Sequence, residues 1–204
     1  MLLGDADDPS VPEKVAAAKG RSQAKGVALV CPPELLGEDV DLGTRALRED
    51  YPLERVQELQ RRLHALGVIL PAAASAPEHV VQAGTLLNVW TEQPPSAPIR
   101  QLIRELRRHG KRALAGTSAN LTGKPTITDA DEVIAVFGEH VSLILIEDFG
   151  DVPPERRRSA TIVELTQPQP RLLREGSVPA AELAAQLRHL RLGELVAAGD
   201  VRHL

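Results

Sequence analysis

Apolar residues recur along this chain with two periods, one typical of helices and one typical of buried strands. Between Pro52 and Leu66 the apolar side chains follow helical spacing, and Gly67 offers a stop for that helix. Short apolar runs bounded by proline, glycine or polar residues predict strands. The predicted strands cover residues 26–31, 68–70, 86–90, 112–116, 141–146, 161–165 and 171–174. This alternation of helices and strands, without internal repeats, predicts one α/β domain.

Capping residues mark the expected starts of further helices. Ser10 and Glu13 have the spacing of a capping box, which predicts a short helix that ends near Gly20. Similar signals predict helices that begin near residues 98 and 129.

The two ends of the chain differ from its middle. Residues 1–10 are acidic and contain few core residues, so no element is predicted there. After Pro179 the chain is rich in alanine and leucine, which favours a helix. The sequence therefore predicts one domain over residues 1–178, followed by a helical tail over residues 179–204.

Composition narrows the classes of function. Hydrophobic residues make up 43% of the 204 residues and charged residues 25%, as in ordinary globular proteins. Aromatic residues make up only 2%, which argues against RNA binding by stacked rings, and the net charge of −4 argues against a surface that binds nucleic acid throughout. The single Cys31 is expected to be a buried structural thiol in a reducing compartment. No run approaches the length of a membrane helix, so we expect a cytoplasmic protein with no membrane partner.

Two basic clusters follow apolar segments, where α/β proteins place ligand-binding loops. The first contains Lys19, Arg21 and Lys25, and its first two cations are expected to project from a loop. Such side chains suit phosphate oxygens. The second is a run of three arginines at 156–158, which leads through a strand to Arg174 and suggests an anion or RNA contact. Each cluster also fits a solvated surface loop.

A third polar cluster runs from Gly116 to Pro125 with the sequence GTSANLTGKP. Its small residues let a ligand approach the backbone, and the side chains of Thr117, Ser118 and Asn120 offer hydrogen bonds without a competing charge. The spacing is not that of a Walker loop. On the residues alone, a binding loop and an ordinary polar turn explain this run equally well.

Metal and hydrolase chemistry are not indicated by the motifs. The six histidines show no HxxxH or HExxH spacing, and no GxSxG motif is present. We therefore expect no metal site and no hydrolase elbow.

Taken in order, the polar clusters resemble the YrdC-like family, whose characterised members are threonylcarbamoyl-AMP synthases. The most specific anchor is the run TSANLTGKP at residues 117–125. Further anchors are the basic cluster at 19–25 and the segments ATIVEL at 160–165 and LLREG at 172–176. The resemblance covers roughly residues 4–178. It implies an α/β fold with a twisted mixed sheet, flanking helices and a large basic cavity.

The resemblance also implies a reaction, in which ATP, L-threonine and bicarbonate yield threonylcarbamoyl-adenylate and pyrophosphate for a tRNA modification. ATP with Mg²⁺ would enter as a substrate, and no tightly bound cofactor is expected. The residues that the resemblance assigns to nucleotide and phosphate binding are Lys19, Arg21, Lys25, Thr117, Ser118, Asn120 and Arg174. It assigns no single catalytic residue.

Several positions depart from the family's pattern. The strand and the P-T-D-T-x-Y-G-L loop with which family members begin have no counterpart in this sequence, which starts where that loop would end. The family's G-V-R-x-P element corresponds to residues 87–91, which removes an arginine from the expected cavity, and Ala160 replaces a serine. Because such contacts act together, their loss is expected to reduce catalysis by orders of magnitude.

Three interpretations follow from this comparison. The first is a divergent synthase that uses ATP, L-threonine and tRNA as partners. The second is a non-catalytic module that binds ATP or AMP, tRNA or double-stranded RNA through its basic residues. The third is that the natural chain begins earlier than this sequence. An incomplete sheet edge exposes unpaired backbone groups, so we expect that either a homodimer or the tail after Pro179 covers this edge.

Overall fold

The structure is a computed structural model that describes residues 1–22, 25–63, 65–91, 98–127, 129–145 and 158–197. Its strands are β1 (Leu2–Asp5), β2 (Ala28–Val30), β3 (Leu66–Pro71), β4 (Val81–Gln82), β5 (Thr85–Trp90), β6 (Leu114–Thr117), β7 (Thr161–Glu164), β8 (Arg171–Arg174) and β9 (Val196–Ala197). Its α-helices are α1 (Val11–Ala18), α2 (Leu53–Arg62), α3 (Pro98–Arg108), α4 (Ala130–Phe137) and α5 (Ala180–His189). Short helical turns cover Pro33–Glu38, Ala46–Asp50, Glu78–Val80 and Gly138–His140.

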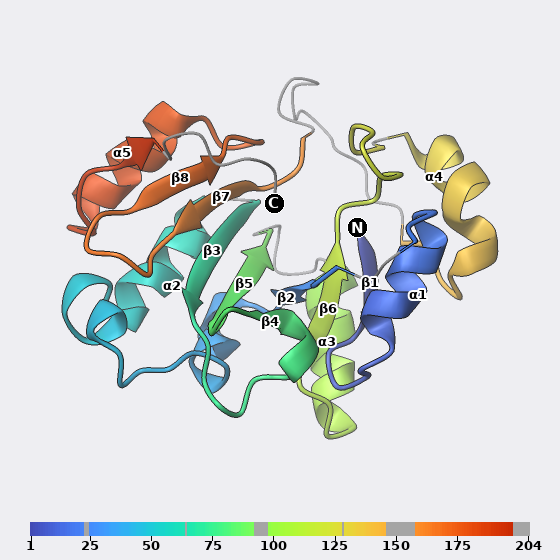
Figure 1. Cartoon of the computed structure of the whole chain (residues 1–204), viewed down its shortest axis with the longest axis horizontal. Helices are drawn as coiled ribbons and strands as arrows, with labels where there is room; N and C mark the ends of the chain where they lie inside the picture. The colour runs from blue at the N-terminus through green and yellow to red at the C-terminus, as the bar shows by residue number, and fades with distance from the viewer. Residues whose placement is uncertain (23–24, 64, 92–97, 128, 146–157, 198–204) are drawn as a thin grey trace.

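Within these ranges, nine strands form one mixed sheet in the order β1-β6-β2-β5-β3-β7-β8-β9, with β4 paired to β5. The pairs β2–β5, β3–β7 and β8–β9 are parallel, and the remaining neighbours are antiparallel. Figure 1 shows β7, β8 and α5 on one side of the molecule and β6, β1, α1 and α4 on the other. The predicted mixed sheet with flanking helices is confirmed.

Successive residues of the central strands face two environments. On β5, Leu86 and Asn88 are buried in the interior, whereas Leu87 and Val89 line a cavity. Strand β3 behaves in the same way, since its Ile69 lines the cavity between two buried neighbours. Because successive side chains of a strand point to opposite faces, one face of the sheet carries the core and the other carries the cavity.

The core packs helices from three parts of the chain against the sheet. Its main cluster includes Val15 from α1, Leu59 from α2 and Leu187 from α5. A smaller cluster joins Ile103 of α3 to Trp90 at the end of β5. No helix in the described part of the chain is long and apolar enough to cross a membrane.

A buried polar group interrupts the apolar centre of the sheet. The side-chain amide of Asn88 donates to the carbonyl of Cys31 at 3.3 Å and to Gln60 Oε1 at 3.3 Å. Its oxygen accepts the N–H of Cys31 at 3.2 Å. These bonds satisfy the amide in the interior, where an unpaired polar group would be costly. Cys31 is itself fully buried, as predicted.

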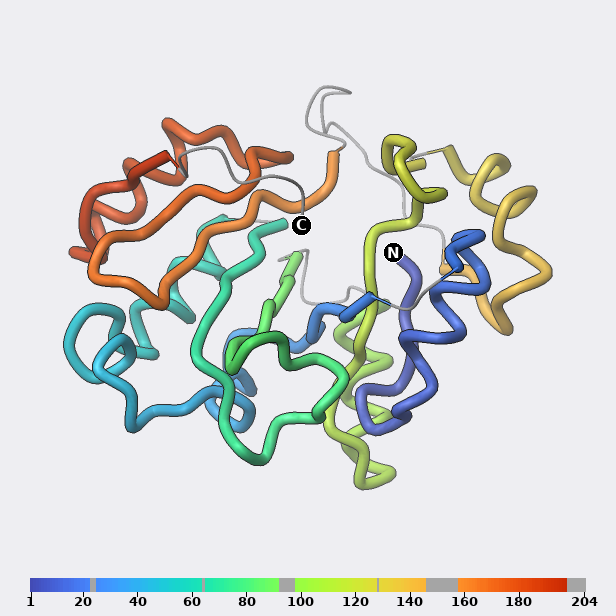
Figure 2. Tube along the Cα trace, in the orientation of Figure 1, coloured from blue at the N-terminus to red at the C-terminus, as the bar shows by residue number. Residues whose placement is uncertain are grey.

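The N-terminal residues form a strand that the sequence pattern did not predict. Strand β1 pairs with β6 although the two segments lie more than a hundred positions apart in the sequence, and Figure 2 shows them side by side. Gly116 permits this pairing, because a Cβ atom there would lie 2.2 Å from the backbone oxygen of Leu2. The expected capping box of α1 is wrong, since the Ser10 hydroxyl donates to Asp8 Oδ1 at 2.6 Å and caps no helical N–H.

Other boundaries also differ from the prediction. Residues 141–145 form no strand, and Leu143 and Leu145 are exposed; Ile146 lies outside the described residues. Gly67 lies inside β3 and does not end α2, whose last residue is Arg62. The helix expected after Pro179 is α5, and the chain then adds β9 beside β8, which was not predicted. The division at residue 178 stays a prediction.

Candidate functional site

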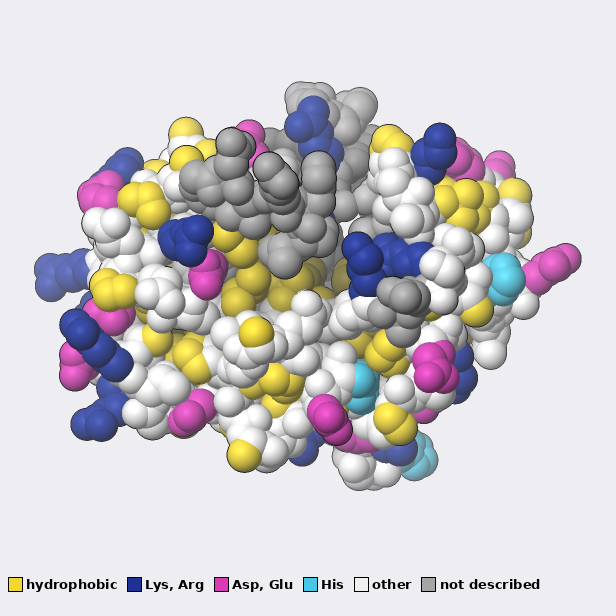
Figure 3. Space-filling model, viewed as in Figure 1, with side chains coloured by type: hydrophobic (Ala, Val, Ile, Leu, Met, Phe, Trp, Pro, Cys, Tyr) yellow, Lys and Arg dark blue, Asp and Glu magenta, His cyan; other side chains and the backbone are white. Residues whose placement is uncertain are grey.

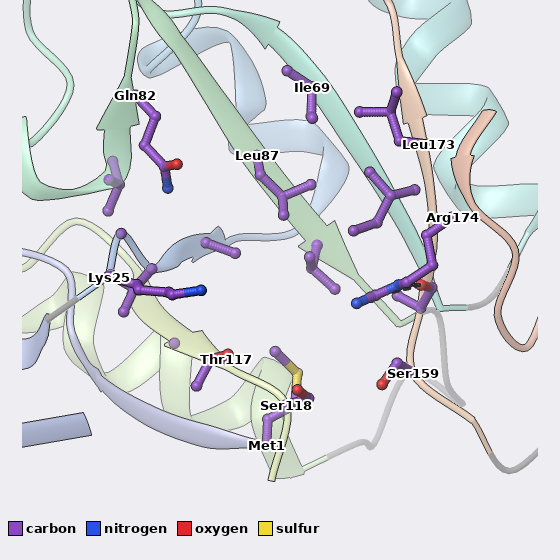
Figure 4. Close-up of a pocket in the computed structure, with 18 of the residues that line it drawn as sticks. Met1, Lys25, Ile69, Gln82, Leu87, Thr117, Ser118, Ser159, Leu173 and Arg174 are labelled. Carbon is purple, nitrogen blue, oxygen red and sulfur yellow. Dashed lines mark hydrogen bonds between the residues drawn. The ribbon is translucent and has the colours of Figure 1, made fainter. Parts of the chain in front are cut away.

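A cavity of about 900 Å³ opens on the face of the sheet opposite the core. Its floor is apolar and comes from neighbouring strands, as Figure 4 shows for Ile69 on β3, Leu87 on β5 and Leu173 on β8. Lys and Arg side chains stand at its edge, where Figure 3 shows a hollow with hydrophobic atoms inside. The site thus combines a cationic rim with an apolar floor.

Five of the seven predicted binding residues line this cavity. They are Arg21, Lys25, Thr117, Ser118 and Arg174. Thr117 ends β6 and Ser118 follows it, so the sheet delivers the start of the TSAN loop (residues 117–120) to the cavity. Lys19 and Asn120 do not line the cavity, and they contact each other instead.

Lys19 does not project from a loop as the sequence suggested. It caps the C-terminal end of α1 and is only 2% exposed. Its Nζ donates to the carbonyl of Ser118 at 3.0 Å and to Asn120 Oδ1 at 2.8 Å. Burial and, less strongly, the charge of Arg21 lower the pKa of the Lys19 ammonium to about 8. Lys19 therefore places a positive charge directly beneath the loop.

Asn120 holds the TSAN loop in shape. Its Oδ1 accepts hydrogen bonds from Lys19 Nζ and from Ser118 Oγ, the latter at 2.6 Å. Its Nδ2 donates to the carbonyls of Leu121 at 3.0 Å and Lys124 at 2.9 Å. These four bonds use the full capacity of an amide side chain. Asn120 can bind a ligand only if one of them is exchanged, and the Ser118 hydroxyl must likewise turn away from Asn120 to donate to a phosphate.

Arg21 and Lys25 supply cations from the segment between α1 and β2. Arg21 Nε donates to Thr122 Oγ1 at 2.9 Å, which ties the guanidinium to the loop and leaves its other nitrogens for a ligand. Lys25 is exposed and points into the cavity (Figure 4). Both residues thus lie on the TSAN side of the site.

Arg174 faces them from the opposite side of the cavity (Figure 4). Its Nε and Nη2 both donate to the carbonyl of Ala160, at 3.1 and 2.8 Å. Two bonds to one oxygen fix the plane of the guanidinium. Burial lowers the pKa of Arg174, but a guanidinium remains protonated at neutral pH. The cavity is therefore positively charged from both sides.

Most cations at this site lack carboxylate partners within the described ranges, namely Lys19, Arg21, Lys25, Arg158 and Arg174. Arg171 also lines the cavity, but it is paired at 3.3 Å with Glu164, which lines the cavity as well. By contrast, other arginines are paired with carboxylates, as Arg107 is with Glu38 and Arg112 with Asp39. Cations that outnumber the carboxylates around a hollow create a field that favours an anionic ligand.

The comparison with protein families agrees with this geometry. The model of the Sua5/YciO/YrdC family, described as "Telomere recombination", matches residues 1–176. The chain belongs to the Sua5/YciO/YrdC family.

Similar proteins carry names from the Sua5/YciO/YrdC family. Putative threonylcarbamoyl-AMP synthases of Mycobacterium tuberculosis and Mycobacterium leprae are each 39% identical to this chain over 74 residues. That match spans 36% of this chain and 32% of the relatives, so it covers about a third of each protein.

Solved structures show the same fold. P. abyssi Sua5 complexed with L-threonine matches 96% of this chain and 52% of its own length, with a TM-score of 0.71 and 23% identity. E. coli YciO matches 85% of this chain and 77% of its own length, with a TM-score of 0.60 and 19% identity. This chain thus spans about half the length of Sua5.

Two departures from the Sua5/YciO/YrdC pattern fall inside the cavity. Val89 and Ala160 both line it, at the positions where the resemblance places an arginine and a serine. The floor is accordingly more apolar than the resemblance implies.

Sequence reasoning missed two hydroxyl residues of the site, Thr126 and Ser159. Both line the cavity, and their Oγ atoms lie 2.5 Å apart. Of the arginine run, Arg158 lines the cavity, while residues 156–157 lie outside the described part of the chain. The signal that could have found Ser159 is its place just before the apolar run that forms β7.

Proposed function

We propose that this chain binds an adenine nucleotide in the cavity and acts as a divergent threonylcarbamoyl-AMP synthase. ATP, L-threonine and bicarbonate would give threonylcarbamoyl-adenylate and pyrophosphate, for the modification of tRNA. The names of the mycobacterial relatives and the family match support this choice of reaction.

One observation carries the proposal: cations surround an apolar floor, and among the described cations that line the cavity only Arg171 is paired with a carboxylate. A nucleotide joins a polyanionic chain to a flat, largely apolar base, so it needs both surfaces at once. The cavity of about 900 Å³ lies in the upper part of the range for small-molecule sites. An anion without an apolar part would leave the floor of Leu87, Val89 and Leu173 exposed to water.

The five predicted residues that line the cavity each have a role in the proposal. Arg21, Lys25 and Arg174 contact phosphate oxygens of ATP, whose Mg²⁺ enters as part of the substrate. Thr117 and Ser118 offer loop groups to the same phosphates. The amine of threonine and bicarbonate form a carbamate with loss of water, a carbamate oxygen attacks the α-phosphorus, and pyrophosphate leaves.

The test is pyrophosphate release from ATP with and without threonine and bicarbonate. We expect release that requires both co-substrates and that falls roughly 10–100-fold in Arg21→Ala and in Arg174→Ala. Arg45→Ala is the matched control, because Arg45 is paired with Glu49 at 3.2 Å outside the cavity. No threonine-dependent release at high protein concentration would refute the synthase.

A second candidate is a non-catalytic module that binds a nucleotide or RNA. Val89 and Ala160 favour it, because they remove polar groups from the cavity while its cations persist. Calorimetry with ATP and with a tRNA fragment distinguishes the two. Salt-sensitive binding that weakens in Arg174→Ala, together with no threonine-dependent pyrophosphate release, would support the module.

A further inference from the structure

Two successive residues of β8, Leu173 and Arg174, both line the main cavity (Figure 4). In a regular strand, successive side chains point to opposite faces of the sheet. Arg171 and Leu173 follow this rule, because both line the cavity while Leu172 between them packs against the core. By the same alternation Arg174 would face away from the cavity. An irregularity in the strand must therefore turn it.

The pairing of β7 with β8 is irregular just before Arg174. Val163 pairs with Leu172 and its neighbour Ile162 pairs with Arg174, so Leu173 is an extra residue on β8. Such a bulge changes the direction of the side chains that follow it, and it interrupts the ladder of backbone hydrogen bonds. The bulge explains why Arg174 reaches the cavity, and it leaves the chain after Arg174 in need of other partners.

The hydroxyl of Thr161 on β7 supplies those partners. Its Oγ1 accepts the N–H groups of Gly176 at 2.9 Å and Val178 at 3.1 Å, and it donates to the carbonyl of Val178 at 2.6 Å. These three bonds use the full capacity of a hydroxyl group. Thr161 is fully buried, so water cannot replace it. The path of residues 176–178 therefore depends on this one side chain.

The residues next to Thr161 hold the same stretch of chain. The guanidinium of Arg174 donates to the carbonyl of Ala160, and the N–H of Ser177 donates to the carbonyl of Ser159 at 3.0 Å. The two segments lie so close that a Cβ atom on Gly176 would be 2.0 Å from the Ser159 oxygen. A shift of residues 176–178 would thus pull Arg174 away from its carbonyl partner.

We propose that Thr161 is a positioning residue, whose buried hydroxyl holds β8 in the bulged form that turns Arg174 into the cavity. Thr161 does not line the cavity, so it acts on a ligand through Arg174. The proposal rests on the proposed nucleotide binding, in which Arg174 contacts phosphate oxygens.

Calorimetry with Mg-ATP, without threonine and bicarbonate, tests this role. Thr161→Val keeps the shape of the side chain and removes the hydroxyl. We expect ATP affinity to fall about tenfold, as for a weakened charge-assisted hydrogen bond. Thr161→Ser keeps the hydroxyl and should stay within about twofold of the wild type. In the Arg174→Ala background, Thr161→Val should have no further effect, because the group that it positions is absent. An equal further fall in that background would overturn the proposal.

Val163→Ala is the matched control for general loosening of β7. Val163 is fully buried on the same strand and does not line the cavity. Its truncation should lower the free energy of unfolding but change ATP affinity by less than about twofold. If Val163→Ala weakened ATP binding as much as Thr161→Val, loss of stability would explain both results and the positioning role would be refuted.

Nitrogen-15 NMR of the arginine Nε–H groups gives a readout that needs no ligand. The Nε–H of Arg174, which Arg174→Lys identifies by removing its signal, should exchange slowly with water in the wild type and in Thr161→Ser. It should exchange rapidly in Thr161→Val. Slow exchange in folded Thr161→Val would overturn the proposal.

The same readout separates the two proposals. If the wild type does not bind ATP, the nucleotide proposal fails, and Arg174 exchange alone decides the role of Thr161. If Thr161→Val does not fold, Thr161→Ser decides it. Slow Arg174 exchange in Thr161→Ser then supports the positioning role of the hydroxyl, and rapid exchange refutes it.

Discussion

The ammonium group of Lys19 is buried between the backbone of Ser118 and the side chain of Asn120. Its charge acts on the site through the loop that it supports. Because burial and the nearby Arg21 lower the pKa of Lys19 to about 8, a modest rise in pH removes this charge. A neutral amine then lies beneath the loop.

The first prediction concerns the stability of the free protein against pH. The unfolded chain keeps the Lys19 proton up to its ordinary pKa of 10.5, whereas the folded chain releases it near 8. The unfolded state thus binds more protons in this window, so the contribution of Lys19 to the free energy of unfolding rises with pH from about 8 to about 10.5. Below that window the cost of the buried charge is fully present.

Urea unfolding at about pH 7.5 and about pH 9.5 measures this contribution. The wild type should gain stability over this interval relative to Lys19→Met, whose side chain does not titrate. Lys14→Met is the control, since Lys14 is exposed. Equal pH dependence in the wild type and Lys19→Met would contradict a lowered pKa.

At this scale the sequence identified the right residue types but not their partners. Lys19 was selected for its charge, yet its bonds join positions 99 and 101 residues apart, which no local pattern reveals. Thr126 and Ser159 meet across 33 positions in the same way. Asn120 was selected as a polar loop residue, and only the fold reveals that its hydrogen-bonding capacity is used within the loop.

Among the elements, the β1–β6 pair depends most on a single residue. A methyl group on Gly116 would lie 2.2 Å from the backbone oxygen of Leu2, so the two strands must separate to admit it. We predict that Gly116→Ala lowers the free energy of unfolding by about 1–3 kcal/mol, as overpacking does elsewhere. Chemical denaturation measures this loss.

Gly138→Ala provides the matched control for this substitution. Gly138 has an ordinary helical φ of −56°, and an added Cβ would meet Ile134 at 3.7 Å. Alanine should be neutral or stabilising there by less than about 1 kcal/mol, because it restricts the unfolded chain. Similar losses of unfolding free energy in Gly116→Ala and Gly138→Ala would mean that close packing at Gly116 does not cause the destabilisation.

The elements that the sequence failed to predict have physical reasons. Residues 141–145 have the composition of a strand, but a strand also needs a hydrogen-bonded neighbour, and composition does not say whether one exists. Strand β1 has only four residues and lies in an acidic segment. It is too short to show an alternation of apolar and polar residues. The longer β3, β5 and α2 were predicted because their apolar pattern repeats.

For the molecule as a whole, the packing of α5 and β9 against earlier elements bears on the predicted division at residue 178. Leu187 of α5 is fully buried in the main core cluster. We predict that Leu187→Ala lowers the free energy of unfolding by about 2–5 kcal/mol and leaves a single cooperative transition. Unfolding followed by both circular dichroism and fluorescence of Trp90 measures both features.

Leu143→Ala is the control, because Leu143 is 65% exposed and its truncation should change stability by less than about 0.5 kcal/mol. Two separate transitions, or no loss in Leu187→Ala, would instead favour an independent tail after residue 178. The sequence predicted the helix of this segment correctly, but its packing against α2 and the sheet depends on distant residues.

The buried amide of Asn88 has a consequence for which side chains a ligand meets. If β5 slipped by one position against its neighbours, Asn88 would turn into the cavity and Leu87 and Val89 would enter the core. Both faces of such a slipped sheet would still carry apolar side chains. Apolar packing alone would therefore favour the native register only weakly over the slipped one. The bonds of Asn88 to Cys31 and Gln60 form only in the native alignment. A residue that does not line the cavity thereby determines which side chains form its floor.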